Sequence, residues 1–176
     1  EAIHLGYPSS FSIYDQSDAV RLAGYVIRDL NLDSKRFPAA AIHANISAAK
    51  NDLLSPEAYA DRAANPFERR IAEIYREYQR RLLASGAMDF DDLLVNAVNV
   101  LARNPDVLER YQTRFEHVLV DEFQDTNKAQ NELVRLLAGK WRNVFVVGDA
   151  DQSIYRFRGA DMANILDFER NFPDAV

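Results

Sequence analysis

The chain contains no cysteine, and this absence excludes several kinds of site at once. Disulfide bonds, cysteine-ligated zinc, iron–sulfur clusters and thiol nucleophiles all need a sulfur atom that the sequence does not supply. A reducing compartment is therefore compatible with the composition. Long hydrophobic runs are also missing: stretches such as Val144–Val147 fall far short of the roughly 20 apolar residues that span a membrane.

Histidine is scarce as well. The three histidines, His4, His43 and His117, are scattered and have no partner at a spacing typical of metal ligands. From spacing alone we expect no transition-metal site, and we interpret His117 as a structural residue beside a strand. The serines are not accompanied by a His/Asp pattern that would indicate a hydrolase triad.

Positive charge is in deficit, because 21 Lys and Arg stand against 27 Asp and Glu for a net charge of −6. This balance provides no bulk attraction to nucleic acid or to an anionic membrane. A length of 176 residues, 48% of them hydrophobic, is enough for one domain, or for a compact domain with a subdomain. The sequence starts at Glu1 without a signal-peptide pattern, and we expect it to be a segment of something longer.

Helical periodicity dominates the first half of the chain. Capping residues and apolar residues at helical spacing predict helices over about 15–30, 38–50, 55–65 and 66–85. The last of these carries arginines on its polar face, interleaved with glutamates: Arg69, Arg70, Arg76, Arg80 and Arg81. A nucleic-acid contact is one interpretation of this face, and a solvated face with local ion pairs is the one we favour.

The second half has a different pattern. Two short apolar runs, His117–Val120 and Val144–Val147, flank a predicted helix from about Asn127 to Ala138, and both runs end in acidic residues. This order predicts a βαβ unit with parallel strands that are fully buried. We place the boundary near 86–89, between an all-helical part (residues 1–88) and an α/β part (residues 89–176).

The strand ends carry the candidate chemistry, because ligands of such sheets bind beyond the carboxyl ends of the strands. Asp121 can hold Mg²⁺, and Glu122 can orient or deprotonate a water that attacks a γ-phosphate, as in a Walker B element. Two acids after a strand are also common in a plain solvated loop. Gln152, past the second strand, has an amide suited to a hydrogen bond with a terminal phosphate.

Aromatic residues follow this second strand. Tyr155 and Phe157 flank Arg156, with Arg158 next, and rings interleaved with arginine can stack on bases without reading sequence. The alternative is that both rings are core residues.

Three segments carry a family resemblance. Val120–Asn127 (VDEFQDTN) resembles the second conserved motif of superfamily 1 DNA helicases of the UvrD/PcrA/Rep type, and Val147–Ala160 (VGDADQSIYRFRGA) resembles their third. Met88–Leu94 (MDFDDLL) is similar to the segment with which those proteins return from an inserted helical subdomain, 1B, to the first RecA-like domain. The resemblance covers essentially the whole chain. It implies an α/β fold, with a partial RecA-like parallel sheet of the P-loop NTPase type and an all-helical insertion.

The resemblance also implies roles at the matching positions. Asp121 would bind Mg²⁺, Glu122 would be the catalytic base, and Gln152 would sense the γ-phosphate of ATP. Tyr155 and Phe157 would stack on single-stranded DNA, with Arg158 coupling to it or contacting it; relatives often carry Trp at the position of Phe157. We assign no individual role to Gln124 or Asp125.

The intact protein would be a cytoplasmic, nucleoid-associated helicase that uses ATP and Mg²⁺, moves 3′→5′ on single-stranded DNA and unwinds duplex in repair or replication. Its partners would be DNA junctions and the remaining helicase domains, with no membrane. No G-x-x-x-x-G-K-[ST] loop occurs in these residues, so we expect the isolated chain to be inactive. The alternatives are a non-enzymatic DNA- or protein-binding module, and the helicase part of a RecB-like helicase–nuclease.

Overall fold

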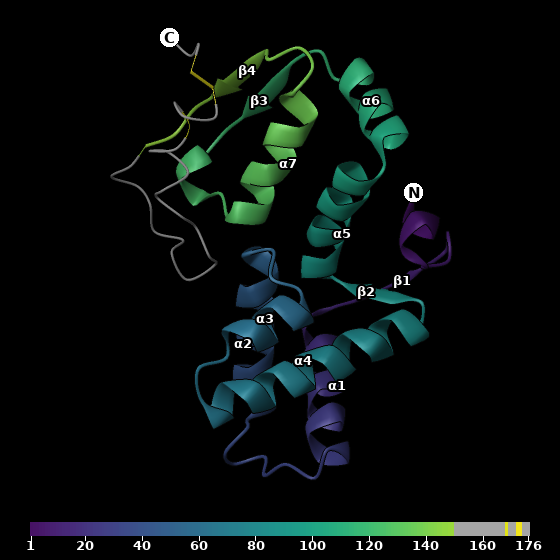
Figure 1. The fold of residues 1–176 in the computed structure, drawn as a ribbon, viewed down its shortest axis with the longest axis vertical. Coiled ribbons are helices and arrows are strands. Elements are labelled where there is room, and N and C mark those ends of the chain that lie inside the picture. The colour runs from purple at the N-terminus through teal and green to yellow at the C-terminus, as the bar shows by residue number, and fades with distance from the viewer. Residues whose placement is uncertain (150–167, 169–171, 174–176) are drawn as a thin grey trace. The chain divides into compact units, whose positions relative to one another are not determined.

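The computed structural model describes residues 1–149, 168, 172 and 173 (Figure 1). The chain forms two compact units, Glu1–Asn96 and Ala97–Val176, each with its own internal contacts. The division falls within helix α5 (Phe90–Arg103), C-terminal to the boundary predicted near residues 86–89. Among the helices that the structure describes, none is long and apolar enough to cross a membrane.

The first unit is built mainly from helices. Its elements are η1 (Ala2–Leu5), β1 (Ser12–Tyr14), α1 (Gln16–Asp29), α2 (Ala39–Asn51), α3 (Pro56–Arg62), α4 (Pro66–Ala84), β2 (Ala87–Asp89) and the first turns of α5. Asp15, Ser55 and Asn65 cap α1, α3 and α4 with their side chains. These three helices therefore begin close to the predicted positions, because the caps and the first-turn prolines are local signals.

Helix α4 lies against α1, α2 and α3 and supplies the centre of the core (Figure 1). Apolar positions three and four residues apart along α4 face inward, and the largest fully buried of these are Ile71, Ile74, Tyr78 and Leu82. Gly86 follows α4 with φ +58°, a left-handed conformation that glycine adopts without strain. This turn directs the chain into β2.

The first unit also contains a sheet. β1 and β2 pair in parallel, with Ser12 opposite Ala87 and Tyr14 opposite Asp89. The prediction of an all-helical first half is therefore not confirmed. Two three-residue strands are too short to show an alternating pattern, and their pairing joins segments more than 70 residues apart.

The second unit holds the predicted βαβ arrangement. Its elements are the end of α5, then α6 (Pro105–Arg114), β3 (Val118–Val120), η2 (Phe123–Asp125), α7 (Lys128–Ala138) and β4 (Val144–Val146). β3 and β4 pair in parallel, so the predicted parallel pair is confirmed. Helix α7 begins with a capping box between Asn127 and Gln130.

The prediction that both strands are fully buried is wrong. Leu119 in β3 is 74% exposed and Phe145 in β4 is 62% exposed, although the residues on either side of each are partly buried. β3 and β4 form a two-stranded sheet, and one face of it is open in the described part of the chain. Buried parallel strands need cover on both faces, and sequence periodicity does not reveal whether that cover is present.

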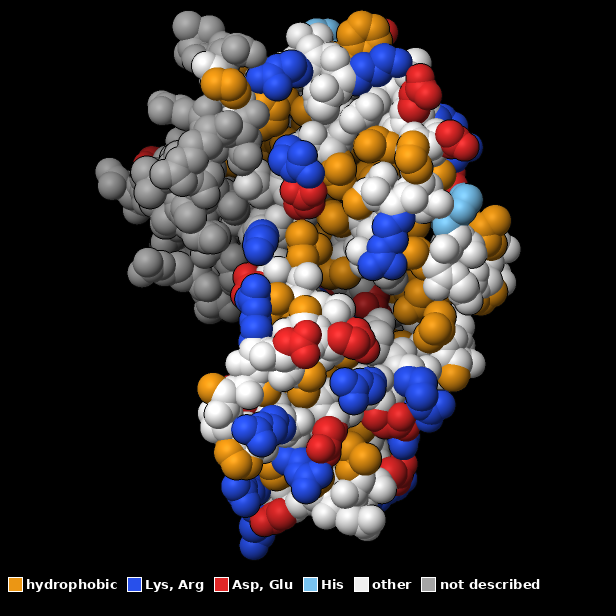
Figure 2. Space-filling model, in the orientation of Figure 1, with side chains coloured by type: hydrophobic (Ala, Val, Ile, Leu, Met, Phe, Trp, Pro, Cys, Tyr) orange, Lys and Arg blue, Asp and Glu red, His pale blue; other side chains and the backbone are white. Residues whose placement is uncertain are grey.

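Charge on the surface of the first unit is mixed. Figure 2 shows Lys and Arg side chains interspersed with Asp and Glu over this unit. On α4, Arg70 pairs with Glu73, and both Arg80 and Arg81 pair with Glu77. The arginine-bearing face of α4 is thus largely a set of local ion pairs, as the favoured interpretation predicts.

Candidate functional site

The candidate site lies where β3 and β4 end. The hydrogen bonds of the strand pair continue past both strands: Val147 N donates to Val120 O at 2.8 Å, and Phe123 N donates to Val147 O at 2.8 Å. Asp121 and Glu122 therefore lie at the same edge of the sheet as Gly148 and the backbone of Asp149. The structure brings the two acidic strand ends together, as expected of parallel neighbours.

Glu122 has an unusual backbone. Its φ of +49° and ψ of +43° lie in the left-handed region, which costs a residue with a side chain on the order of 1 kcal/mol. The Glu122 amide donates to Asp121 Oδ1 at 2.9 Å, which steadies the turn. This turn carries the chain from β3 into η2 and leaves both carboxylates exposed.

Gln124 joins the two strand ends. Its side chain is 1% exposed; Nε2 donates to Glu122 Oε2 at 2.5 Å, and Oε1 accepts from the Asp149 amide at 2.9 Å. One buried amide thus holds the carboxylate after β3 and the backbone after β4. Sequence reasoning gave Gln124 no role, because no periodicity or spacing indicates that a residue in an acidic loop will turn inward.

Gly148 makes room for this bridge. A Cβ atom at Gly148 would lie 2.8 Å from Gln124 Oε1 and 3.3 Å from the Gln124 amide nitrogen. The first contact is with an atom of the bridge, and the second is with the backbone of the same residue. A side chain at position 148 would therefore push Gln124 away from its partners.

The carboxylates at this edge fit a magnesium ion. Neither Asp121 nor Glu122 forms an ion pair within residues 1–149, so no Lys or Arg side chain of these residues neutralises the two carboxylates. Mg²⁺ prefers oxygen ligands, keeps several waters and commonly uses one or two carboxylates together with substrate phosphates. An exposed strand-end pair is compatible with that arrangement, and the assignment of Asp121 as the ligand stays a prediction.

Four predicted site residues, Gln152, Tyr155, Phe157 and Arg158, lie outside the described residues. Their roles stay predictions.

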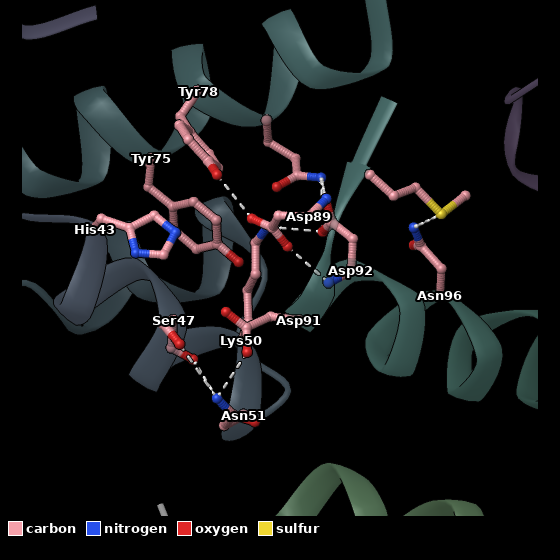
Figure 3. A network of polar contacts seen from close by, with 12 residues as sticks. His43, Ser47, Lys50, Asn51, Tyr75, Tyr78, Asp89, Asp91, Asp92 and Asn96 are labelled. Carbon is pink, nitrogen blue, oxygen red and sulfur yellow. Dashed lines mark hydrogen bonds and ion pairs between the residues drawn. The ribbon is translucent and has the colours of Figure 1, made fainter. Parts of the chain in front are cut away.

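A second polar cluster lies in the first unit, and Figure 3 shows it from close by. Lys50 Nζ lies 2.7 Å from Asp89 Oδ2 and 2.8 Å from Asp92 Oδ1, and these three side chains are 1–3% exposed. Tyr78 OH donates to Asp89 Oδ2 at 2.8 Å, and Gln79 Nε2 donates to both oxygens of Asp92. The cluster links α2, α4 and the start of α5.

Burial and charge oppose one another in this cluster. Burial disfavours charged Lys50, but Asp89 and Asp92 outweigh it, so the pKa of Lys50 is raised. Burial also raises carboxyl pKa values, yet Lys50 and its hydrogen bond hold the pKa of Asp89 below its ordinary value. For Asp92, burial and the nearby Asp89 charge prevail over Lys50, and its pKa is raised. Asp89 also caps α5, because its Oδ1 accepts from the Asp92 amide at 2.8 Å, and sequence reasoning gave it no role at a site.

Comparison with known proteins places these features in a family. Residues 1–173 match the family described as the UvrD/REP helicase N-terminal domain. The chain is 43% identical over 171 residues to ATP-dependent DNA helicase PcrA of Bacillus subtilis, covering 97% of this chain and 23% of that protein. It is 48% identical over 171 residues to PcrA of Leuconostoc citreum, again covering 97% and 23%.

PcrA of Staphylococcus epidermidis is 46% identical over 176 residues, with coverage of 99% of this chain and 24% of that protein. The chain spans about a quarter of the length of the relatives that it matches. The match runs through both units, including the strand-end site. The chain therefore belongs to the UvrD/REP helicase N-terminal domain family.

Proposed function

We propose that this chain is a segment of an ATP-dependent DNA helicase of the PcrA/UvrD type. Residues 1–88 would correspond to the inserted 1B-like subdomain, and residues 89–176 to the C-terminal part of the first RecA-like domain. The observation that carries the proposal is the Gln124 bridge, which joins Glu122 to the backbone after β4 at the edge where nucleotides bind in parallel sheets. The open face at Leu119 and Phe145 is compatible with cover by further elements of a longer protein.

Glu122 would act as the base in ATP hydrolysis. Its carboxylate is exposed to the solvent side of the strand end and can accept a proton from an attacking water. Gln124 donates to Oε2 and so fixes the carboxylate, leaving Oε1 to orient the water. Asp121 would hold Mg²⁺, which when bound neutralises charge on the β- and γ-phosphates.

The same bridge offers a route between nucleotide and DNA. Gln152 would hydrogen-bond the γ-phosphate, and Tyr155, Phe157 and Arg158 would contact single-stranded DNA. The segment that carries these four residues follows directly after Asp149, whose amide is held by Gln124. A shift of the Glu122 carboxylate during hydrolysis would therefore act on the start of the DNA-contacting segment.

The full-length protein would translocate 3′→5′ on single-stranded DNA and unwind duplex, in DNA repair or replication, as a cytoplasmic protein associated with the nucleoid. An unwinding assay tests this with duplexes that carry a single-stranded tail at either the 3′ or the 5′ end, in the presence of ATP and Mg²⁺. We expect strand separation only from the 3′ tail. Unwinding of neither substrate would contradict the helicase proposal, and unwinding from the 5′ tail alone would contradict the polarity.

The isolated 176 residues should hydrolyse no ATP, because they contain no phosphate-binding loop with its lysine. Phosphate release measured with and without single-stranded DNA tests this. DNA-stimulated turnover by the isolated chain would contradict it.

A non-enzymatic DNA-binding module is the second candidate, motivated by the arginines of α4. Pairing of Arg70, Arg80 and Arg81 with glutamates reduces the charge that this face can offer to phosphates. Salt-dependent binding of single-stranded DNA that is lost on neutralising Arg69, Arg70, Arg80 and Arg81, but kept on substituting Tyr155 and Phe157, would favour this function.

A further inference from the structure

A small cavity in the first unit lies beside the buried ion cluster. Its volume is about 80 Å³, and the residues that line it include Gln16, His43, Ser47, Asp89 and Asp91. It is therefore formed by the start of α1, one face of α2 and the junction of β2 with α5. The residues that line it belong to the first unit, whereas the predicted ATP-site residues Asp121 and Glu122 belong to the second.

His43 lines this cavity with an unused nitrogen. The side chain is 3% exposed, and Nε2 is buried without a hydrogen-bond partner. The other ring nitrogen, Nδ1, lies 3.4 Å from Gln16 Nε2. A buried imidazole nitrogen without a partner is costly, and a ligand that accepts its lone pair would remove that cost.

Two carboxylates lie within reach of this imidazole. One ring nitrogen of His43, one oxygen of Asp89 and one oxygen of Asp91 all lie within 4.8 Å of one another. Figure 3 shows the three residues as members of the same polar network. Asn51 donates to Asp91 Oδ1 at 3.1 Å, which holds this carboxylate in place and engages only one of its oxygens. Asp89 is oriented by Lys50 and Tyr78.

We propose that His43, Asp89 and Asp91 bind a divalent transition-metal cation with the ligand preferences of Zn²⁺. An imidazole with two carboxylates is a donor set that suits Zn²⁺ better than the all-oxygen ions Mg²⁺ and Ca²⁺. Ligand atoms around tetrahedral Zn²⁺ lie roughly 3.5 Å apart, so small rotations of His43 and Asp91 close the set around the ion. A water molecule in the cavity completes four-coordination.

Neighbouring residues supply a hydrogen bond to the imidazole and a charge balance that favours a cation. If the Gln16 amide turns over about its last bond, Oε1 replaces Nε2 beside His43, accepts the Nδ1 proton and leaves Nε2 for the metal. Asp89, Asp91 and Asp92 carry three formal negative charges, and Lys50 is the cation that pairs with two of them. A divalent cation neutralises the negative charge that Lys50 leaves uncompensated. Sequence spacing did not reveal this site because its ligands come from α2 and, more than 40 residues later, from the end of β2 and the start of α5.

The imidazole nitrogens give the most direct test. The chain has three histidines, so ¹⁵N spectra of their rings in the 176-residue chain, recorded during a Zn²⁺ titration, contain one set of signals for each. We expect saturable shifts of the His43 signals with one equivalent of Zn²⁺, while His4 and His117 shift less. Absence of a saturable change at His43 would overturn the proposal, and so would equal shifts at all three histidines.

Calorimetric titration with Zn²⁺ measures how substitution of the proposed ligands changes the affinity. His43→Asn and Asp91→Asn should each weaken binding at least tenfold, whereas the matched control His117→Gln should leave it within about twofold. Circular dichroism confirms that each variant is folded. Asp91 is only half-buried, so we expect Asp91→Asn to fold. This variant therefore tests the site even if His43→Asn does not fold. Unchanged affinity in a folded Asp91→Asn variant would contradict the site.

Discussion

Gln124 donates a hydrogen bond to Glu122 across 2.5 Å, and the same amide accepts from the backbone of Asp149. A buried neutral side chain therefore couples the two strand ends of the candidate ATP site. The pairing explains why an amide is required at position 124: it must donate on one side and accept on the other. A carboxylate could not donate, and an alkyl side chain could do neither.

We expect Gln124→Leu to reduce ATP turnover of the full-length protein about 10- to 100-fold, because Glu122 loses the donor that orients it. Gln124→Glu should be at least as damaging, since it places a second negative charge against Glu122. Steady-state phosphate release at saturating single-stranded DNA measures both. Turnover within twofold of wild type in Gln124→Leu would show that the bridge is not used.

Gln130→Ala is the matched control. It removes half of the capping box of α7, only six residues further along the chain, without touching the bridge. We expect a loss of about 1 kcal/mol in the free energy of unfolding and little change in turnover.

Gly148→Ala should destabilise the protein by about 1–3 kcal/mol, since its Cβ would lie 2.8 Å from Gln124 Oε1. Gly24→Ala provides the comparison: the new Cβ would meet Ala39 at an ordinary 3.6 Å inside α1, and helix propensity should raise stability by about 0.5–1 kcal/mol. Urea unfolding followed by circular dichroism compares the two. Equal effects of both substitutions would rule out the predicted clash at position 148.

Lys50→Met should be the most destabilising of these substitutions, by about 3–5 kcal/mol, because it leaves Asp89 and Asp92 buried without their cation. Arg70→Met removes one partner of an exposed ion pair with Glu73 and should cost less than about 1 kcal/mol. Urea unfolding measures both changes. A Lys50→Met variant as stable as Arg70→Met would show that the buried cluster does not stabilise the first unit.

Alkaline pH should unfold the first unit steeply. Burial raises the pKa of Tyr75 and of Tyr78, and the carboxylates raise that of Lys50 against the effect of burial. The unfolded chain loses these protons near the ordinary values of 10.0 and 10.5, while the folded chain keeps them. Stability is therefore complete below about pH 10 and falls above it, by about 1.4 kcal/mol per pH unit for each group.

Tyr75→Phe removes one of these groups, so the slope well above pH 10 should become shallower by about 1.4 kcal/mol per pH unit. Urea unfolding at several pH values gives the slope, and tyrosinate absorbance reports when the buried rings ionise. An unchanged slope in Tyr75→Phe would contradict this assignment.

Much of the secondary structure could be predicted because its signals are local. Asp15, Ser55 and the first-turn prolines mark helix starts, and the runs at Val118 and Val144 mark the parallel strands. The β1–β2 pair, the Lys50 cluster and the Gln124 bridge could not be predicted in this way. Each of the three depends on contacts between residues distant in sequence or on one side chain that turns inward. Such contacts produce no periodic pattern in the sequence.

The central claim is that Glu122 is the catalytic base of an ATP site at these strand ends. The most direct measurement compares ATP turnover and nucleotide affinity of the full-length protein with those of Glu122→Gln, at saturating Mg²⁺ and single-stranded DNA. We predict that turnover falls by about 10²- to 10⁴-fold while ATP affinity stays within about threefold, because only the proton acceptor is lost. Near-normal turnover in Glu122→Gln would contradict the account.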